Sequence, residues 1–76
     1  MLCALTGRKL TNENISLDHI TPVSLGGKTE ISNLQFVTLG ANRAKGIMSN
    51  TELLSLCQDI VKTLLDKKEM SDKILV

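Results

Sequence analysis

The chain of 76 residues contains a single aromatic side chain, Phe36, and has neither tryptophan nor tyrosine. Any core must therefore be built from leucine, isoleucine, valine and methionine. No apolar run approaches the ~20 residues that cross a bilayer, which excludes an integral membrane protein. The opening residues 1–7 also lack the basic region and the long apolar stretch of a signal peptide. We therefore expect a small cytoplasmic domain, with 1–76 as one unit.

Cysteine and net charge are also scarce. Cys3 and Cys57 are the two cysteines, and they lie far apart in the sequence. This favours free buried thiols in a reducing compartment, with a disulfide as the alternative. The net charge is only +1, but basic residues outnumber acidic ones five to three in residues 1–50. A polyanionic partner should therefore meet the first half of the chain, through few phosphate contacts.

Residues 1–14 have the turn chemistry of a loop-rich segment. Apolar alternation predicts a strand over 15–20, which should end before Pro22, and a second strand over 34–37. Gly26-Gly27 marks a turn between them. The pattern predicts a β-hairpin with an unusually large connecting loop, and loops of this kind in small domains often carry function.

Two helices should follow the hairpin. The first runs over 39–45, with Thr38 as its N-cap and Gly46 as its stop. The second, over 51–68, should support the domain. Its apolar residues fall on one stripe at helical spacing: Leu53, Leu54, Cys57, Ile60, Val61, Leu64 and Leu65. We expect this stripe to bury against the hairpin and the first helix. The alternative is a dimer seam, although two heptads are too few to specify a coiled coil.

The polar residues with chemical potential lie between Asp18 and Lys45. Asp18 and His19 end the first predicted strand, whereas Asn42 and Lys45 are spaced i, i+3 on one face of the short helix. If that face packs over the hairpin, Asp18 and Asn42 bring two oxygen ligands together, which suits a hard cation such as Mg²⁺. A histidine beside such a site can take a proton from water.

Strand geometry sets a condition on this site. Neighbouring residues of an ideal strand point to opposite faces, so Asp18 and His19 should diverge. They serve one site if the strand kinks near Pro22, or if a substrate passes between them. His19 taken alone is more often a structural histidine, and Lys45 taken alone is as often a helix-end lysine that complements the dipole.

These residues together resemble the HNH endonuclease motif of the ββα-metal nucleases, over roughly residues 3–47. The matching segments are Asp18-His19-Ile20-Thr21-Pro22, Gly26-Gly27, Asn33-Leu34-Gln35 and Asn42-Arg43-Ala44-Lys45. The form is a His-Asn-Asn variant, similar to the nuclease domain of RNA-guided DNA nucleases.

The resemblance implies an α+β fold in which a β-hairpin and a short helix, over 15–47, surround one divalent metal ion, Mg²⁺ or Mn²⁺. It implies that Asp18 and Asn42 hold the metal and that His19 is the general base. It also implies that Asn33 orients His19 through backbone contacts. By the same resemblance, Lys45 and Arg43 contact the substrate phosphate.

Many HNH proteins carry two Cys-x-x-Cys knuckles that hold a structural zinc. In this chain Thr6 stands where the second cysteine of the first knuckle belongs, and residues 38–41 hold no cysteine. One cysteine cannot make a tetrahedral zinc site. We therefore expect no structural zinc, and we expect Cys3 to be a small buried apolar residue.

The function expected from the resemblance is hydrolysis of phosphodiester bonds in double-stranded DNA, one strand nicked per active site. With little net charge and no aromatic platform, the chain should bind DNA weakly, which points to a targeting domain or protein partner in a phage or mobile element. We expect a monomer or a weak homodimer. Two alternatives remain open: a non-catalytic nucleic-acid-binding module, and a protein-interaction module that uses the stripe on 51–68.

Overall fold

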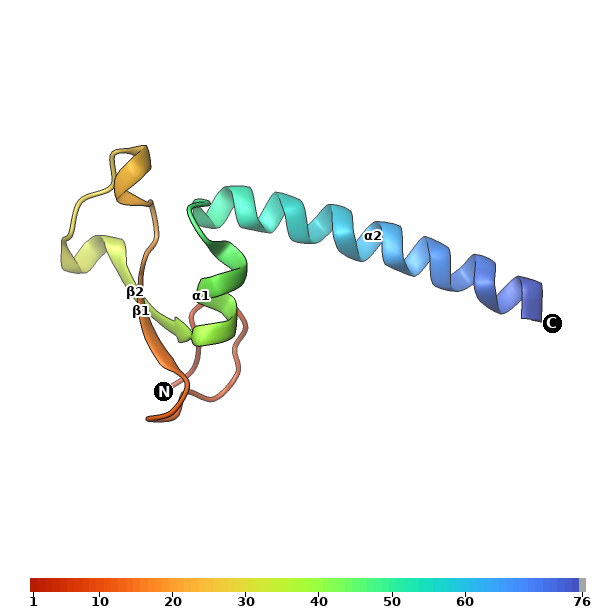
Figure 1. The fold of residues 1–76 in the computed structure, drawn as a ribbon, viewed down its shortest axis with the longest axis horizontal. Helices are drawn as coiled ribbons and strands as arrows, with labels where there is room; N and C mark the ends of the chain where they lie inside the picture. Colours follow the sequence, from red (N-terminus) through yellow and green to blue (C-terminus); the bar gives the residue numbers. More distant parts are fainter. Residues whose placement is uncertain (76) are drawn as a thin grey trace.

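A two-stranded antiparallel sheet and two helices form the fold of the computed structural model, which describes residues 1–75 and the side chains of residues 1–68. The elements in chain order are β1 (Ile15–His19), η1 (Val23–Leu25), η2 (Ile31–Asn33), β2 (Leu34–Thr38), α1 (Leu39–Lys45) and α2 (Asn50–Leu75). Figure 1 shows β1, β2 and α1 gathered at one end of the molecule. The predicted α+β class, a hairpin and a short helix extended by a C-terminal helix, is confirmed.

The hairpin has the large connecting loop that the sequence predicts. Ile15 pairs with Thr38 at one end of the ladder and His19 with Leu34 at the other. Each strand differs from its predicted range by one residue at its C-terminal end. The single-turn 3-10 helices η1 and η2 lie within the loop, which the Ile20 amide closes by donating to the Asn33 carbonyl at 2.8 Å. The loop therefore begins directly after His19.

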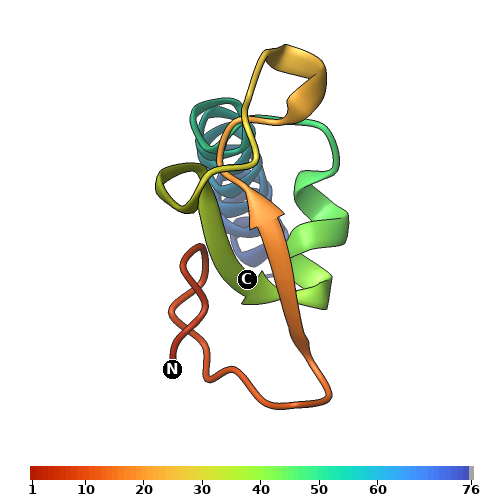
Figure 2. The same cartoon turned by 90° about the vertical axis from the view of Figure 1, so that its left-hand side faces the viewer.

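The two faces of the hairpin differ in an unexpected way. The apolar residues Ile15, Leu17 and Phe36 lie on the face turned away from α1 and are 38%, 52% and 44% exposed. Because side chains alternate along a strand, the other face carries Ser16, Asp18, Gln35 and Val37, and α1 packs there (Figure 2). The covered face of the sheet is therefore mostly polar.

The small hydrophobic core lies between the N-terminal segment, β2 and α1. It consists of Cys3, Leu10 and Val37, with Leu5 and Ala41 packed against it. The N-terminal segment is attached to the sheet by the Ala4 amide, which donates to the Phe36 carbonyl at 3.0 Å. The predicted burial of Cys3 is confirmed, since this cysteine is 3% exposed.

The Cys3 thiol occupies a polarised position within this core. Burial raises the pKa of the Cys3 thiol, but hydrogen bonds from the Thr6 side chain and from the backbone amides of Thr38, Thr6 and Leu5 outweigh it. Together they lower its pKa from 9.0 to about 6. The Thr38 amide donates to Sγ at 3.3 Å, so this sulfur also joins the N-terminal segment to the start of α1.

Helix α1 begins and ends at the predicted residues. The Thr38 hydroxyl accepts a hydrogen bond from the Ala41 amide at 3.1 Å, which is the N-cap contact. Gly46 follows the last helical residue with a φ of 55°, a backbone conformation that residues other than glycine rarely adopt. Both ends of this helix are therefore set by local sequence, and its position fixes where Asn42 and Lys45 lie.

The prediction that the second helix buries its apolar stripe is wrong. Helix α2 runs to Leu75, past the predicted end at residue 68, and projects away from the hairpin (Figure 1). Its residues Leu54, Cys57, Ile60, Val61, Leu64 and Leu65 are all exposed. The cause is direction: α2 leaves the domain after the turn at residues 46–49, and no other helix or strand runs beside its stripe (Figure 1). Only the first two turns, from Asn50 to Cys57, border the rest of the domain. None of the helices in the described residues is long and apolar enough to cross a membrane.

Gly27 gives the first testable prediction, because the loop after His19 closes tightly around it. A Cβ added there would lie 1.8 Å from the Thr21 carbonyl oxygen and 2.9 Å from that of Pro22. We expect Gly27→Ala to lower the free energy of unfolding by about 1–3 kcal/mol, the usual cost of overpacking. The matched control is Gly40→Ala on α1, where a Cβ meets nothing within 4 Å. It should raise stability by about 1 kcal/mol or less. Urea unfolding followed by circular dichroism measures both, and equal effects would contradict the prediction.

Candidate active site

A buried ion pair lies at the end of β1. The Lys45 ammonium donates to Oδ2 of Asp18 at 2.7 Å and also to the His19 carbonyl oxygen. Asp18 is 7% exposed and Lys45 is 1% exposed. The Gln35 amide donates to the same Oδ2 at 2.8 Å and exchanges hydrogen bonds with Asn50 at 3.0 and 3.2 Å. The Asp18 carboxylate is therefore held by two donors from β2 and α1.

Residues on one face of α1 are spaced similarly to residues on the covered face of β1, and this match explains the contacts. Asn42 and Lys45 are about one helical turn apart, whereas Ser16 and Asp18 are two residues apart on the same face of β1. The two intervals are similar, so the Asn42 amide donates to the Ser16 hydroxyl at 2.6 Å while Lys45 reaches Asp18. Asn42 is thereby placed on the same covered face as Asp18.

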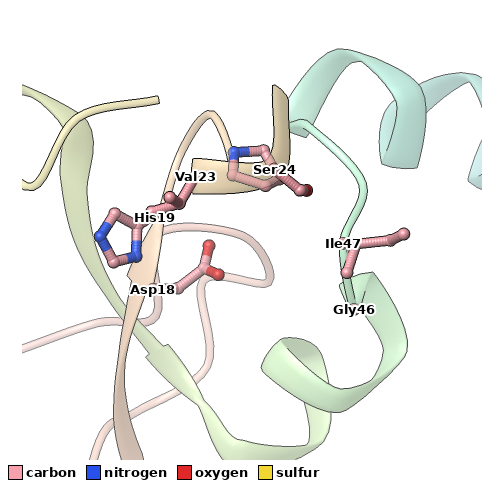
Figure 3. A pocket seen from close by; sticks show the side chains of 7 residues that line it. Asp18, His19, Val23, Ser24, Gly46 and Ile47 are labelled. Atoms are coloured by element: carbon pink, nitrogen blue, oxygen red, sulfur yellow. The ribbon is translucent and has the colours of Figure 1, made fainter. Parts of the chain in front are cut away.

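His19 and Asp18 point to opposite sides of β1, as strand geometry predicts. Figure 3 shows the Asp18 carboxylate turned toward the Gly46–Ile47 segment and the His19 ring on the other side of the strand. His19 Nε2 lies 3.0 Å from the Thr29 hydroxyl. Both residues nevertheless border one pocket of about 320 Å³ at the strand end. Its lining residues are Asp18, His19, Pro22, Val23, Ser24, Gly46 and Ile47. The end of β1 thus brings the two groups to one opening.

Asn33 braces the loop that follows His19. Its side-chain oxygen accepts from the Thr21 amide at 2.9 Å, and its amide nitrogen donates to the carbonyls of Thr21 at 3.0 Å and Lys28 at 2.7 Å. One side chain thus satisfies three backbone groups on two sides of the loop. Asn33 was expected to contact the backbone in this way. The expectation that it thereby orients His19 stays a prediction.

The sequence model of the HNH endonuclease family matches residues 3–54, more than half of the chain. The matched stretch contains the hairpin, α1 and every residue of the ion-pair network. The chain belongs to the HNH endonuclease family. No curated protein and no solved structure matches it. Membership implies a nuclease-type function with a nucleic-acid substrate, and HNH nucleases generally use a divalent metal ion.

Lys45 lies in the interior of the domain, and its phosphate contact stays a prediction. Its ammonium is turned into the protein and bound to Asp18. The physical reason is that a lysine four carbons long can reach from α1 to the buried carboxylate on β1, and a buried charge is favoured only when it is paired. Arg43 is exposed on α1, and its phosphate contact stays a prediction.

Two functional contacts were missed from the sequence. Gln35 binds Asp18, and Thr29 binds His19. The first had a signal: in an antiparallel hairpin Asp18 is opposite Gln35, so their side chains share a face. The contact between Thr29 and His19 had no such signal in the sequence, because Thr29 lies in an irregular loop whose path no short-range pattern specifies.

The oxygen atoms around Asp18 fit a hard divalent cation. Among the residues that the structure describes, no three histidine, cysteine, aspartate or glutamate side chains cluster as metal ligands. The site instead offers the Asp18 carboxylate and the His19 carbonyl, two oxygen ligands that suit Mg²⁺, while the Asn42 amide is bonded to Ser16 further along the same face of β1. The Lys45 ammonium, which contacts two of these oxygens, shows that the position attracts positive charge.

Proposed function

We propose that this HNH protein is a metal-dependent endonuclease that hydrolyses DNA phosphodiester bonds and nicks one strand per active site. The observation that carries the proposal is the shared pocket at the end of β1. A potential base, His19, and a buried carboxylate, Asp18, both border it, and Asn42 lies on the carboxylate's side. Neither a binding module nor a structural module requires that combination.

His19 acts as the general base for the attacking water. In the tautomer in which Nε2 carries the ring proton, Nε2 donates to the Thr29 hydroxyl 3.0 Å away, and this contact holds the ring in one orientation. The other ring nitrogen, Nδ1, is then without its proton and accepts one from water. Asn33 supports this geometry by fixing the backbone of the loop that starts after His19.

Asp18 and Asn42 would hold the divalent ion, Mg²⁺ or Mn²⁺. When bound, the ion supplies positive charge that stabilises the 3′ oxygen as it leaves phosphorus. The products are then a 5′-phosphate and a 3′-hydroxyl. Arg43, which is exposed on α1 and follows Asn42 in the sequence, would contact the DNA backbone. With a net charge of +1, the chain relies on a targeting domain or protein partner for tight DNA binding.

Nicking of supercoiled plasmid tests this function. Conversion to open circle should occur with Mg²⁺ or Mn²⁺ and stop with EDTA. Asn42→Ala removes one oxygen ligand, so it should require a higher metal concentration for half-maximal nicking. The matched control is Asn12→Ala, which alters an exposed asparagine in the N-terminal turn and should leave the metal requirement unchanged. An unchanged requirement in Asn42→Ala would remove Asn42 from the metal site.

Two other outcomes would favour other functions. Folded protein that binds DNA without nicking it at any metal concentration would indicate a nucleic-acid-binding module. Folded protein that neither binds nor nicks DNA would point to a protein-interaction module. The exposed apolar stripe of α2 is the observation that favours this second candidate.

A further inference from the structure

Lys45 is among the most deeply buried side chains of the described residues, together with Val37. Lysine is almost never fully buried unless its charge is paired. Here the ammonium has two oxygen partners, the Asp18 carboxylate and the His19 carbonyl. A lysine that is simply a helix-end residue would extend into solvent, so its position needs a specific explanation.

The two oxygens that hold the ammonium belong to the site proposed for the metal ion. A divalent ion on Asp18 sits ~2 Å from a carboxylate oxygen. The Lys45 nitrogen is already 2.7 Å from Oδ2 of the same carboxylate. Two cations this close inside a protein repel each other strongly, because the interior screens charge poorly. An ion bound to Oδ2 would therefore compete with the ammonium for that oxygen.

We propose that the Lys45 ammonium occupies the cation position of the metal-free protein and leaves it when a divalent ion binds. The inference rests on the proposed function, in which Asp18 is a metal ligand. Lys45 is then a positioning residue: it keeps the Asp18 carboxylate neutralised and in place without metal. Its displacement opposes metal binding, so it also sets the metal affinity of the site.

The surroundings give the displaced side chain a route outward. The pocket beside Asp18 is bordered by Gly46 and Ile47, the two residues directly after Lys45. Ile47 is 77% exposed, so this side of the pocket opens to solvent. The four-carbon stem of Lys45 is flexible and can turn toward this side. The ammonium then faces the pocket that Asp18 and His19 border, where it can contact substrate phosphate.

Lysine acylation of the unaltered protein tests the exchange directly. With an acylating reagent and peptide mass spectrometry, Lys45 should react slowly without metal and at least about tenfold faster with saturating Mn²⁺, as a buried amine becomes exposed. Lys9 and Lys28, both exposed, serve as internal controls and should react equally in both conditions. Fast reaction of Lys45 without metal would contradict its burial and overturn the proposal.

Direct measurement of Mn²⁺ binding separates this inference from the proposed function. Electron paramagnetic resonance of free Mn²⁺ should show binding that is lost in Asp18→Asn and weakened in Asn42→Ala. It should show binding tightened by about 5- to 150-fold in Lys45→Met, the range usual for coupled sites. Mn²⁺ bound through Asp18 while Lys45 stays protected, or with equal affinity in Lys45→Met, would overturn the exchange alone. No Mn²⁺ binding by folded protein would overturn the metal site as well.

Discussion

His19→Ala should lower the rate of plasmid nicking by about 10²- to 10⁴-fold, the usual contribution of a positioned general base. In the proposed mechanism the other site residues would still hold metal and DNA, but none would replace the imidazole as a proton acceptor at the water. Initial rates at saturating metal ion measure the effect.

The fold should survive this substitution, which makes the result interpretable. His19 is only half-buried, and its ring has the Thr29 hydroxyl as its partner at 3.0 Å. Replacing it leaves the Lys45 contact with the His19 carbonyl in place, because that oxygen belongs to the backbone. Circular dichroism of the variant should therefore match that of the unaltered protein.

Thr29→Val is the matched control for ring orientation. It removes the hydroxyl and keeps the size of the side chain, so the base remains but is less well oriented. We expect a smaller loss than in His19→Ala, within the 10-fold to 100-fold range. If His19→Ala nicks as fast as the unaltered protein, His19 is not the base. If Thr29→Val loses as much as His19→Ala, the hydroxyl itself takes part in the reaction.

The elements with local signals could be predicted from the sequence. Thr38 and Gly46 fix the ends of α1 through a side-chain cap and a φ of 55°, and both depend on residues within a single turn. The hairpin strands likewise follow from alternation and Pro22. The position of α2 could not be predicted. An apolar stripe shows that a helix has a face to bury, but it does not show in which direction the helix leaves the domain.

The candidate site also has features that the sequence predicts and features that it does not. Asp18, His19, Asn33 and Asn42 were predicted from their order along the chain, and their roles stay predictions. The structure places the first two at one pocket and Asn42 on the side of Asp18. The burial of Lys45 could not be foreseen, because a lysine at the last turn of a helix is stabilised equally well in solvent. What decides its position is the polar face of the sheet opposite it, and this depends on which face of the hairpin α1 covers.

Removing one charge from the Asp18–Lys45 pair should destabilise the fold by about 3–5 kcal/mol, because the other charge is left buried without its partner. A chain of this length has a total stability of about 4–11 kcal/mol, so either Asp18→Asn or Lys45→Met should remove a large part of it. The double variant Asp18→Asn/Lys45→Met removes both charges at once. It should be more stable than the sum of the two single effects predicts, since it leaves no unpaired ion.

Urea unfolding followed by far-ultraviolet circular dichroism measures this cycle, which suits a chain without tryptophan or tyrosine. Additive single effects would mean that the pair carries no coupling and that each residue acts alone. Mn²⁺ should restore much of the lost stability in Lys45→Met, because a divalent ion replaces the missing cation at Asp18, and should restore none in Asp18→Asn. The same ion pair would then account for the stability of the metal-free protein and for the resistance of the site to metal binding.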